Sequence, residues 1–330
     1  MPVKISHSAR DMLDTCGEKY RLHYIERKRS PLMYSSLFFG NALDAGFSRI
    51  LLEKKKQLTQ EETELLKTSE FDIFNQNMQV FKHNNKEQFL LQNEHCEYYF
   101  SDFDKDLVTP KMEQLVKAYD PSIPSIVEFY DWAVSEIKAK RVLSVEDKRL
   151  YNYICWLSLV EKGLMMLQAY REQILPQIHE VYDIQKKVSL VNAAGDSISG
   201  AIDFTASFVD NPGRKYICDN KSSSKAYKAN AVLESDQLAT YCEAEGSPYA
   251  AYVVVQKTIY KKHPKIKTQI IKGEIKEAQL QETFDKFEQA VYTIEEKRFH
   301  KNKDACFSYG KKCPYYALCH YGKEEGLEDV

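Results

Sequence analysis

The chain has 330 residues, which is enough for one large domain or two small ones around a buried core. With 43% hydrophobic and 28% charged residues it has the composition of a globular protein, and no apolar run predicts a membrane span. A net charge of −2 argues against a protein that coats polyanions, and the N-terminus lacks the apolar core of a signal peptide. A cytoplasmic location is therefore expected.

The first half of the chain predicts helices. Ser6 or Ser8 can cap the first of them, and the second carries an apolar face. Residues 56–148 are polar and rich in Tyr, with helical patterns interrupted by three prolines, the first of them Pro110. We interpret this stretch as a helical insertion. The predicted helices outside it cover residues 6–28, 36–55 and 149–175.

The second half changes to a period of two, which is typical of strands. Turn residues separate the first three predicted strands, and an apolar strand follows a helix. Strands are predicted over residues 181–191, 198–208, 215–221, 249–256 and 268–275, and helices over 229–246 and 276–297. The pattern indicates an α/β core with a mixed central β-sheet flanked by helices.

Two carboxylates and a lysine follow one another on these predicted strands. Asp219 and Lys221 are two residues apart and so project to one side of their strand, where a neighbouring strand can bring Asp203. Asp203 and Asp219, with the backbone carbonyl of Asn220, offer the oxygen ligands that Mg²⁺ or Mn²⁺ takes. Lys221 would orient the attacking water and stabilise charge on a phosphate. This is the chemistry of a nuclease.

Polar residues behind this group are candidates for substrate contact. Ser222 and Ser223 could donate to a phosphate oxygen. Gln237 and Tyr241 are four residues apart, so one helical face carries both, where they could contact DNA or bracket the active site.

The segments Gly200–Phe204, Ile217–Ser223 and Gln237–Tyr241 together resemble the motifs of the PD-(D/E)XK nuclease superfamily. They are similar to its RecB-like branch, which includes AddB-type subunits, CRISPR-associated spacer-acquisition nucleases and phage exonucleases. The resemblance implies a restriction-endonuclease-like core over roughly residues 1–50 and 150–320. The branch has a Gly-x-x-x-His motif whose His is a metal ligand. Here the motif begins at Gly40, and Asp44 stands in the place of the His.

Three cysteines lie close together near the C-terminus, where a reducing compartment favours metal ligation over disulfides. The resemblance implies a [4Fe–4S] cluster held by these three and a distant N-terminal cysteine, joining the two ends of the chain. The four predicted ligands are Cys16, Cys306, Cys313 and Cys319. Zinc is the alternative, although the spacings are longer than those of a zinc knuckle. The other thiols are expected to be buried apolar groups: Cys96, Cys155, Cys218 and Cys242.

The boundaries follow from these assignments. We expect N-terminal helices over 1–55, the insertion over 56–148, the nuclease core over 149–300 and the cysteine segment over 301–330.

The leading hypothesis is a metal-dependent DNA exonuclease in recombination, repair or phage DNA processing, in the cytoplasm of a bacterium or of a phage-infected host. DNA, single-stranded or with duplex ends, is the expected partner. A helicase or recombination protein would have to supply unwinding, because the chain has no phosphate-binding loop of the Gly-x-x-x-x-Gly-Lys-Ser/Thr type. A catalytically silent DNA-binding or assembly subunit is the alternative, and a nuclease acting on RNA is a third possibility.

Overall fold

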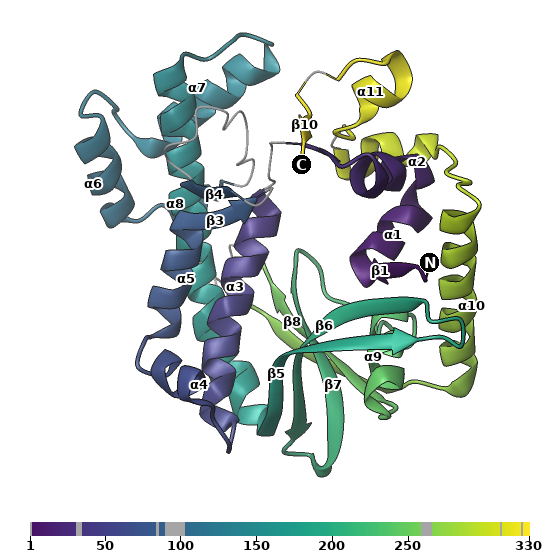
Figure 1. The fold of residues 1–330 in the computed structure, drawn as a ribbon. Coiled ribbons are helices and arrows are strands. Elements are labelled where there is room, and N and C mark those ends of the chain that lie inside the picture. The colour runs from purple at the N-terminus through teal and green to yellow at the C-terminus, as the bar shows by residue number, and fades with distance from the viewer. Residues whose placement is uncertain are drawn as a thin grey trace.

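The computed structural model describes residues 2–30, 35–83, 86–89, 103–258, 266–310, 312–324 and 326–330. Helices flank a central sheet, and the N-terminal segment (purple) lies beside the C-terminal segment (yellow) (Figure 1). The helices are α1 (His7–Thr15), α2 (Gly17–Tyr20), α3 (Ser35–Leu51), α4 (Gln60–Leu65), α5 (Glu70–Gln79), α6 (Pro110–Tyr119), α7 (Ile126–Lys138), α8 (Val145–Ala169), α9 (Asp236–Glu245), α10 (Glu277–Glu295) and α11 (Tyr316–Tyr321). The strands are β1 (Lys4–Ser6), β2 (Lys28–Arg29), β3 (Val80–His83), β4 (Lys86–Phe89), β5 (Ile178–Val191), β6 (Ser197–Phe208), β7 (Asn211–Ser223), β8 (Tyr249–Gln256), β9 (Thr268–Glu274) and β10 (Glu328–Asp329).

The central sheet is mixed and, in the described part of the chain, six-stranded. Strands β5, β6 and β7 form an antiparallel meander, β8 runs parallel to β7 after the crossover through α9, and β9 closes the edge antiparallel to β8. The short strand β1 adds to β6 in parallel. This confirms the mixed α/β fold with helices around one sheet.

Two strands, β1 and β7, share one edge of β6 and diverge from each other, and we call the gap between them the fork. The last residues of β6, Phe204 to Phe208, pair with β7, whereas its first, Ser197 to Ser199, pair with β1. Between the two pairings lies 200–203, where β7 has diverged and the Asn220 backbone N–H donates instead to the Asp203 carboxylate at 2.7 Å. The Asp203 carboxylate therefore accepts the hydrogen bond that a backbone carbonyl of β6 would accept in a regular sheet, and the Gly-x-x-Asp motif lies in the fork.

Apolar side chains fill both faces of the sheet. One face packs on α3, α5 and α8 through a large cluster that includes Phe47, Phe74, Tyr170 and Phe204. The other face packs on α9 through a smaller cluster, and a third cluster lies between α1 and α10. The site is thus held between two layers of helices. Among the described helices, none is long and apolar enough to cross a membrane.

The N- and C-terminal segments are joined by backbone contacts. Strand β10 pairs with β2, and Glu18 N donates to the carbonyl of His300 at 3.1 Å. Gly17 permits this approach, since a Cβ there would lie 3.0 Å from backbone atoms of Phe299 and His300. Tyr20 stacks on Phe299 with ring centroids 5.9 Å apart.

Several predicted boundaries were wrong. The helix expected over 6–28 is interrupted at Cys16, whose extended backbone (φ −166°, ψ 110°) separates α1 from α2, and a π-helical turn over Arg21–Ile25 follows. Ser6 caps α1 by accepting from Ala9 N. Pro110 does not break a helix but occupies the first turn of α6, where its missing N–H costs nothing.

Other corrections concern the insertion and α9. The insertion contains the strand pair β3–β4, which the helical interpretation missed. Helix α9 begins at Asp236 rather than near Ala229, because Ser235 caps it. The expectation for Cys96 falls outside the described residues, whereas Cys155, Cys218 and Cys242 are buried as predicted.

Candidate active site

Three carboxylates and one lysine lie in or beside the fork of the sheet. Asp203 lies on β6 and Asp219 on β7, and their strands pair just before they diverge. Lys221 Nζ lies 2.7 Å from Asp219 Oδ2. Asp44, on α3, lies near enough for its charge to raise the pKa of Asp203. The sheet and one helical layer therefore both contribute acids.

Burial and mutual repulsion dominate the electrostatics. Asp219 is only 2% exposed, and burial raises its pKa although Lys221 opposes the shift. Burial raises the pKa of Asp203 well above its ordinary value, and the charges of Asp219 and Asp44 raise it further. Burial alone would lower the pKa of Lys221, but the adjacent Asp219 outweighs it and the net shift is upward. Without a further cation, the group favours holding protons.

The chemistry of the donor set suits a divalent cation, although the side chains are not arranged around one. Burial and the charge of Asp219 raise the pKa of Asp44 to about 6. Its Oδ1 is buried and makes no hydrogen bond within the described structure, although the Asn220 amide faces this carboxyl. A hard cation would stabilise three such carboxylates together. As the side chains lie, however, no three His, Cys, Asp or Glu of the described residues are gathered closely enough to hold a metal ion. Lys221 lies against one of the two Asp219 oxygens, Oδ2.

A chain of polar contacts holds Lys221 from the α9 side. Lys221 Nζ donates to Gln237 Oε1 at 3.3 Å, and Gln237 Nε2 donates to Tyr241 Oη at 3.2 Å. Tyr241 is 3% exposed and lies directly on Gly200 of β6, where a Cβ would stand 2.4 Å from Tyr241 Oη. Glycine at the first position of the Gly-x-x-Asp motif therefore makes room for the tyrosine of the Gln-x-x-x-Tyr helix.

The remaining predicted residues have local partners. Asn220 Oδ1 accepts from the buried Tyr170 hydroxyl at 3.1 Å. Ser223 Oγ accepts from Lys225 N at 3.2 Å, so this hydroxyl serves a turn. Ser222 follows Lys221 on β7 and pairs in register with Val255.

Two residues that sequence reasoning missed support the site from α1 and β5. Arg10 is 2% exposed and donates to Asp236 at 2.8 Å, at the first residue of α9 and next to Gln237. Gln185 Nε2 donates to Asp44 Oδ2 at 2.7 Å. Neither stands out in the sequence, because an isolated Arg in a helix gives no sign of burial and Gln185 is itself an exposed residue of its strand.

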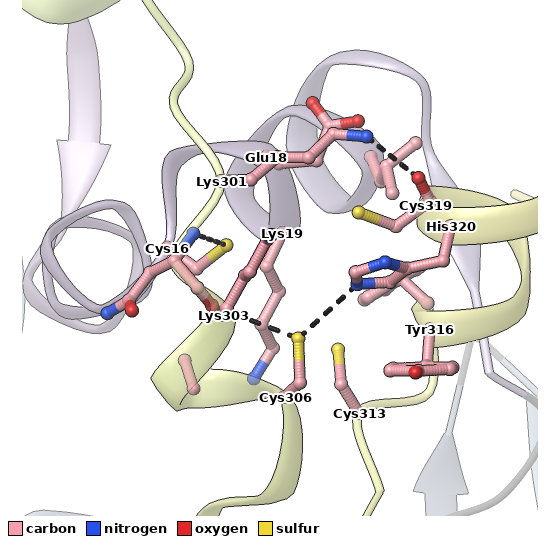
Figure 2. Close-up of a pocket in the computed structure, with 14 residues that line it drawn as sticks. Cys16, Glu18, Lys19, Lys301, Lys303, Cys306, Cys313, Tyr316, Cys319 and His320 are labelled. Carbon is pink, nitrogen blue, oxygen red and sulfur yellow. Dashed lines mark hydrogen bonds between the residues drawn. The ribbon is translucent and has the colours of Figure 1, made fainter.

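A second site is the cysteine pocket, which joins the N- and C-terminal segments. Cys16, Cys306, Cys313 and Cys319 all line it, together with His320 (Figure 2). Cys16 Sγ accepts from the backbone N of Asn302 at 3.5 Å. His320 Nε2 lies 3.6 Å from Cys306 Sγ.

The charges around these thiols suit an anionic group. Burial raises the pKa of Cys313, and the neighbouring Cys306 and Cys16 act in the same direction, whereas Lys19 lowers it. Lys19, Lys301 and Lys303 line the same pocket, as does one acidic residue, Glu18. Thiolate ligands bound to iron or zinc would meet cations there.

Comparison with known protein families supports a superfamily assignment. The sequence pattern of the PD-(D/E)XK nuclease superfamily matches residues 126–320, which is more than half of the chain. The chain belongs to the PD-(D/E)XK nuclease superfamily. The matched segment contains the fork, Lys221 and α9, and it extends to the three C-terminal cysteines; Asp44 and Cys16 lie before it.

The other comparisons add little to the superfamily assignment. The solved structure titled "Crystal structure of SSO0001" is similar with a TM-score of 0.26 and 11% sequence identity, over 55% of this chain and 83% of that one. A likeness of that degree carries no argument about function. Among curated proteins none matches the chain.

Proposed function

We propose that this superfamily member is a divalent-metal-dependent nuclease that hydrolyses phosphodiester bonds in DNA. The observation that carries the proposal is the fork of the sheet, where buried Asp203 and Asp219 adjoin Lys221 and Asp44. Buried acids whose pKa values are raised, and which have a lysine beside them, are found mainly at functional sites.

Asp44, Asp203, Asp219 and the carbonyl of Asn220 would hold Mg²⁺ or Mn²⁺. Such an ion, when bound, lowers the pKa of a water and polarises a phosphate oxygen. Lys221 stays charged at neutral pH, since its pKa is raised, and it would orient the attacking water and stabilise charge on the phosphate.

The substrate contacts divide into two kinds. Ser222 and Ser223 lie just beyond Lys221 on β7, where their hydroxyls could meet a phosphate. Tyr241 is nearly inaccessible and bonded to Gln237, so this pair would act by holding Lys221 rather than by touching DNA directly.

We further propose a RecB-like exonuclease in recombination, repair or phage DNA processing, working with a partner that unwinds DNA. The grouping of four cysteines from both ends of the chain in one pocket supports this branch.

Cleavage of end-labelled DNA tests the activity. Single-stranded, duplex and circular DNA are incubated with Mg²⁺ or Mn²⁺, with labelled RNA as a parallel substrate. We expect degradation from linear ends, and its loss in Asp219→Ala and in Lys221→Ala. Lys187→Ala is the matched control, since Lys187 is an exposed lysine of the neighbouring strand β5. Wild-type cleavage that survives both active-site substitutions would refute the mechanism.

Binding without cleavage would favour the alternative, a catalytically silent DNA-binding or assembly subunit. The observation behind it is Asp44, which replaces the expected histidine. Gel-shift measurements in Ca²⁺, which permit binding to be scored apart from hydrolysis, distinguish the two functions.

We propose that the cysteine pocket binds a structural [4Fe–4S] cluster, with zinc as the alternative. Anaerobic purification followed by metal and sulfide analysis tests it. We expect a brown protein containing iron and sulfide, and their loss in Cys313→Ala but not in Cys155→Ala, a buried thiol of α8 outside the pocket. A colourless protein with stoichiometric zinc would refute the cluster.

A further inference from the structure

Gln185 on β5 has an unusual backbone. Its φ is +52°, a left-handed conformation that a non-glycine residue seldom adopts inside a strand. The β5–β6 ladder pairs Ile184 with Phe204 and Lys186 with Ile202, but the register has no pair between Gln185 and Asp203. The irregularity therefore falls at the acidic residue of the Gly-x-x-Asp motif.

Both strands change face at this point. Ile202 packs in the α9 cluster, whereas Phe204, two residues on, packs in the opposite cluster with α3 and α8. Likewise Val188 packs on the α9 side and Ile184 on the other. Residues separated by an even number share one face of a regular strand, so a local reversal must occur between these pairs. Gln185 is where β5 makes the reversal.

The side chain of Gln185 contacts helix α3, which packs on the sheet. Its Nε2 donates to Asp44 Oδ2 at 2.7 Å, so this amide ties α3 to β5. The other oxygen, Asp44 Oδ1, is buried and makes no hydrogen bond in the described part of the chain. One oxygen of the carboxylate is thus fixed by Gln185, whereas the Asn220 amide, which also faces this carboxyl, makes no hydrogen bond of ordinary geometry to Oδ1.

We propose that Gln185 is a positioning residue that orients the Asp44 carboxylate so that Oδ1 serves as a ligand of the divalent cation. The inference rests on the proposed function, because it assigns a role toward that same metal. Its physical basis is that an aspartate on a helix can rotate about its side-chain bonds, whereas a hydrogen bond to one oxygen fixes the plane of the carboxylate. Strain held at a strand position indicates that the local conformation serves the site.

A structural alternative is that Gln185 matters only through its backbone, by allowing the two strands to change face. Two substitutions separate the accounts. Gln185→Gly keeps the left-handed conformation without strain but removes the amide. Gln185→Glu keeps the length of the side chain but replaces the donor with a carboxylate that repels Asp44.

The test is Mn²⁺ binding to the full-length, metal-stripped protein, measured by calorimetry and by the loss of the free-ion electron paramagnetic resonance signal. We expect Gln185→Gly to weaken Mn²⁺ binding about 10- to 100-fold, as for other residues that hold a metal ligand, and Gln185→Glu to weaken it further. Cleavage at saturating Mn²⁺ should return to within a few-fold of wild type. Lys187→Ala should bind as wild type does.

Wild-type affinity in Gln185→Gly would overturn the inference, because a role through the backbone alone predicts that result. Asp219→Ala serves as the reference for a lost ligand. If wild type itself binds no Mn²⁺ and cleaves nothing, the proposed function fails as well. If wild type binds and Asp219→Ala does not, while Gln185→Gly binds normally, only the inference about Gln185 fails.

Discussion

Gly200→Ala is the most direct perturbation of the contact between β6 and α9. The added Cβ would stand 2.4 Å from Tyr241 Oη and 2.5 Å from its Cε1. Favourable contact needs about 3.5 Å, so the ring would have to move by roughly 1 Å. It cannot do so freely, since Tyr241 is buried on the sheet and bonded to Gln237.

The expected cost follows from overpacking. Forcing an extra carbon into a filled site costs about 1–3 kcal/mol, and a lost hydrogen bond adds about 1 kcal/mol. Removing glycine from a strand returns roughly 0.5–1 kcal/mol. We therefore expect Gly200→Ala to lower the free energy of unfolding by about 1–3 kcal/mol. Because Gln237 also holds Lys221, a shift of this size should lower cleavage on the order of 10²-fold.

Urea denaturation and cleavage rates measure the two effects. Gly40→Ala is the matched control: Gly40 lies in α3 with nothing within 4 Å of an added Cβ, so the change should raise stability by up to about 1 kcal/mol. In a Tyr241→Ala background the added carbon meets no ring, and Gly200→Ala should cost little. Strictly additive effects of the two substitutions would refute the proposed contact.

Three further predictions concern the charges of Lys221 and Asp44 and the contact between the N- and C-terminal segments. Lys221→Met should lower kcat about 10²- to 10³-fold, with Lys187→Met unchanged; equal rates for the two variants would contradict the role of Lys221. In the metal-free protein the folded pKa of Asp44 is raised to about 6, above its unfolded value near 4, so its contribution to stability is complete below pH 4 and is lost as pH rises through 6. Urea titrations should show a loss of stability over this range that is smaller in Asp44→Asn, where Asp203 and Asp219, whose pKa values are also raised, still lose their protons; parallel pH profiles for the two proteins would refute the contribution of Asp44. Gly17→Ala would bring a Cβ within 3.0 Å of the backbone of Phe299. We therefore expect a lower Tm and a lower iron content. Wild-type values of both would show that the contact between the N- and C-terminal segments tolerates a side chain at this position.

The sequence predicted most of the sheet because its signals are local. Strands β5 to β9 have alternating patterns, a turn that contains Gly195 separates β5 from β6, and an apolar run marks β8. The start of α9 was missed although Ser235 is an ordinary cap, because Val232 continues a helical spacing. In the structure Val232 packs on Gly273 instead, a contact between segments distant in sequence.

The parts of the site that sequence reasoning missed depend on long-range geometry. Strand β1 has three residues and forms only because β6 offers a free edge where β7 has diverged. The left-handed Gln185 has no sequence signal, since glycine or asparagine ordinarily marks that conformation. The motif could name Asp203, Asp219 and Lys221, but it could not reveal what holds them.

Helix α1 connects the cysteine segment to Lys221, which that segment does not contact. The helix ends at Thr15, directly before Cys16, and it is nine residues long, or roughly 13 Å. From its middle, Arg10 donates to Asp236 at the start of α9, whose next residue, Gln237, holds Lys221. The position of Lys221 therefore depends on where α1 lies, and the contacts of Cys16 with the C-terminal segment fix one end of α1. A group bound in the cysteine pocket would stabilise the active site through this helix without taking part in hydrolysis.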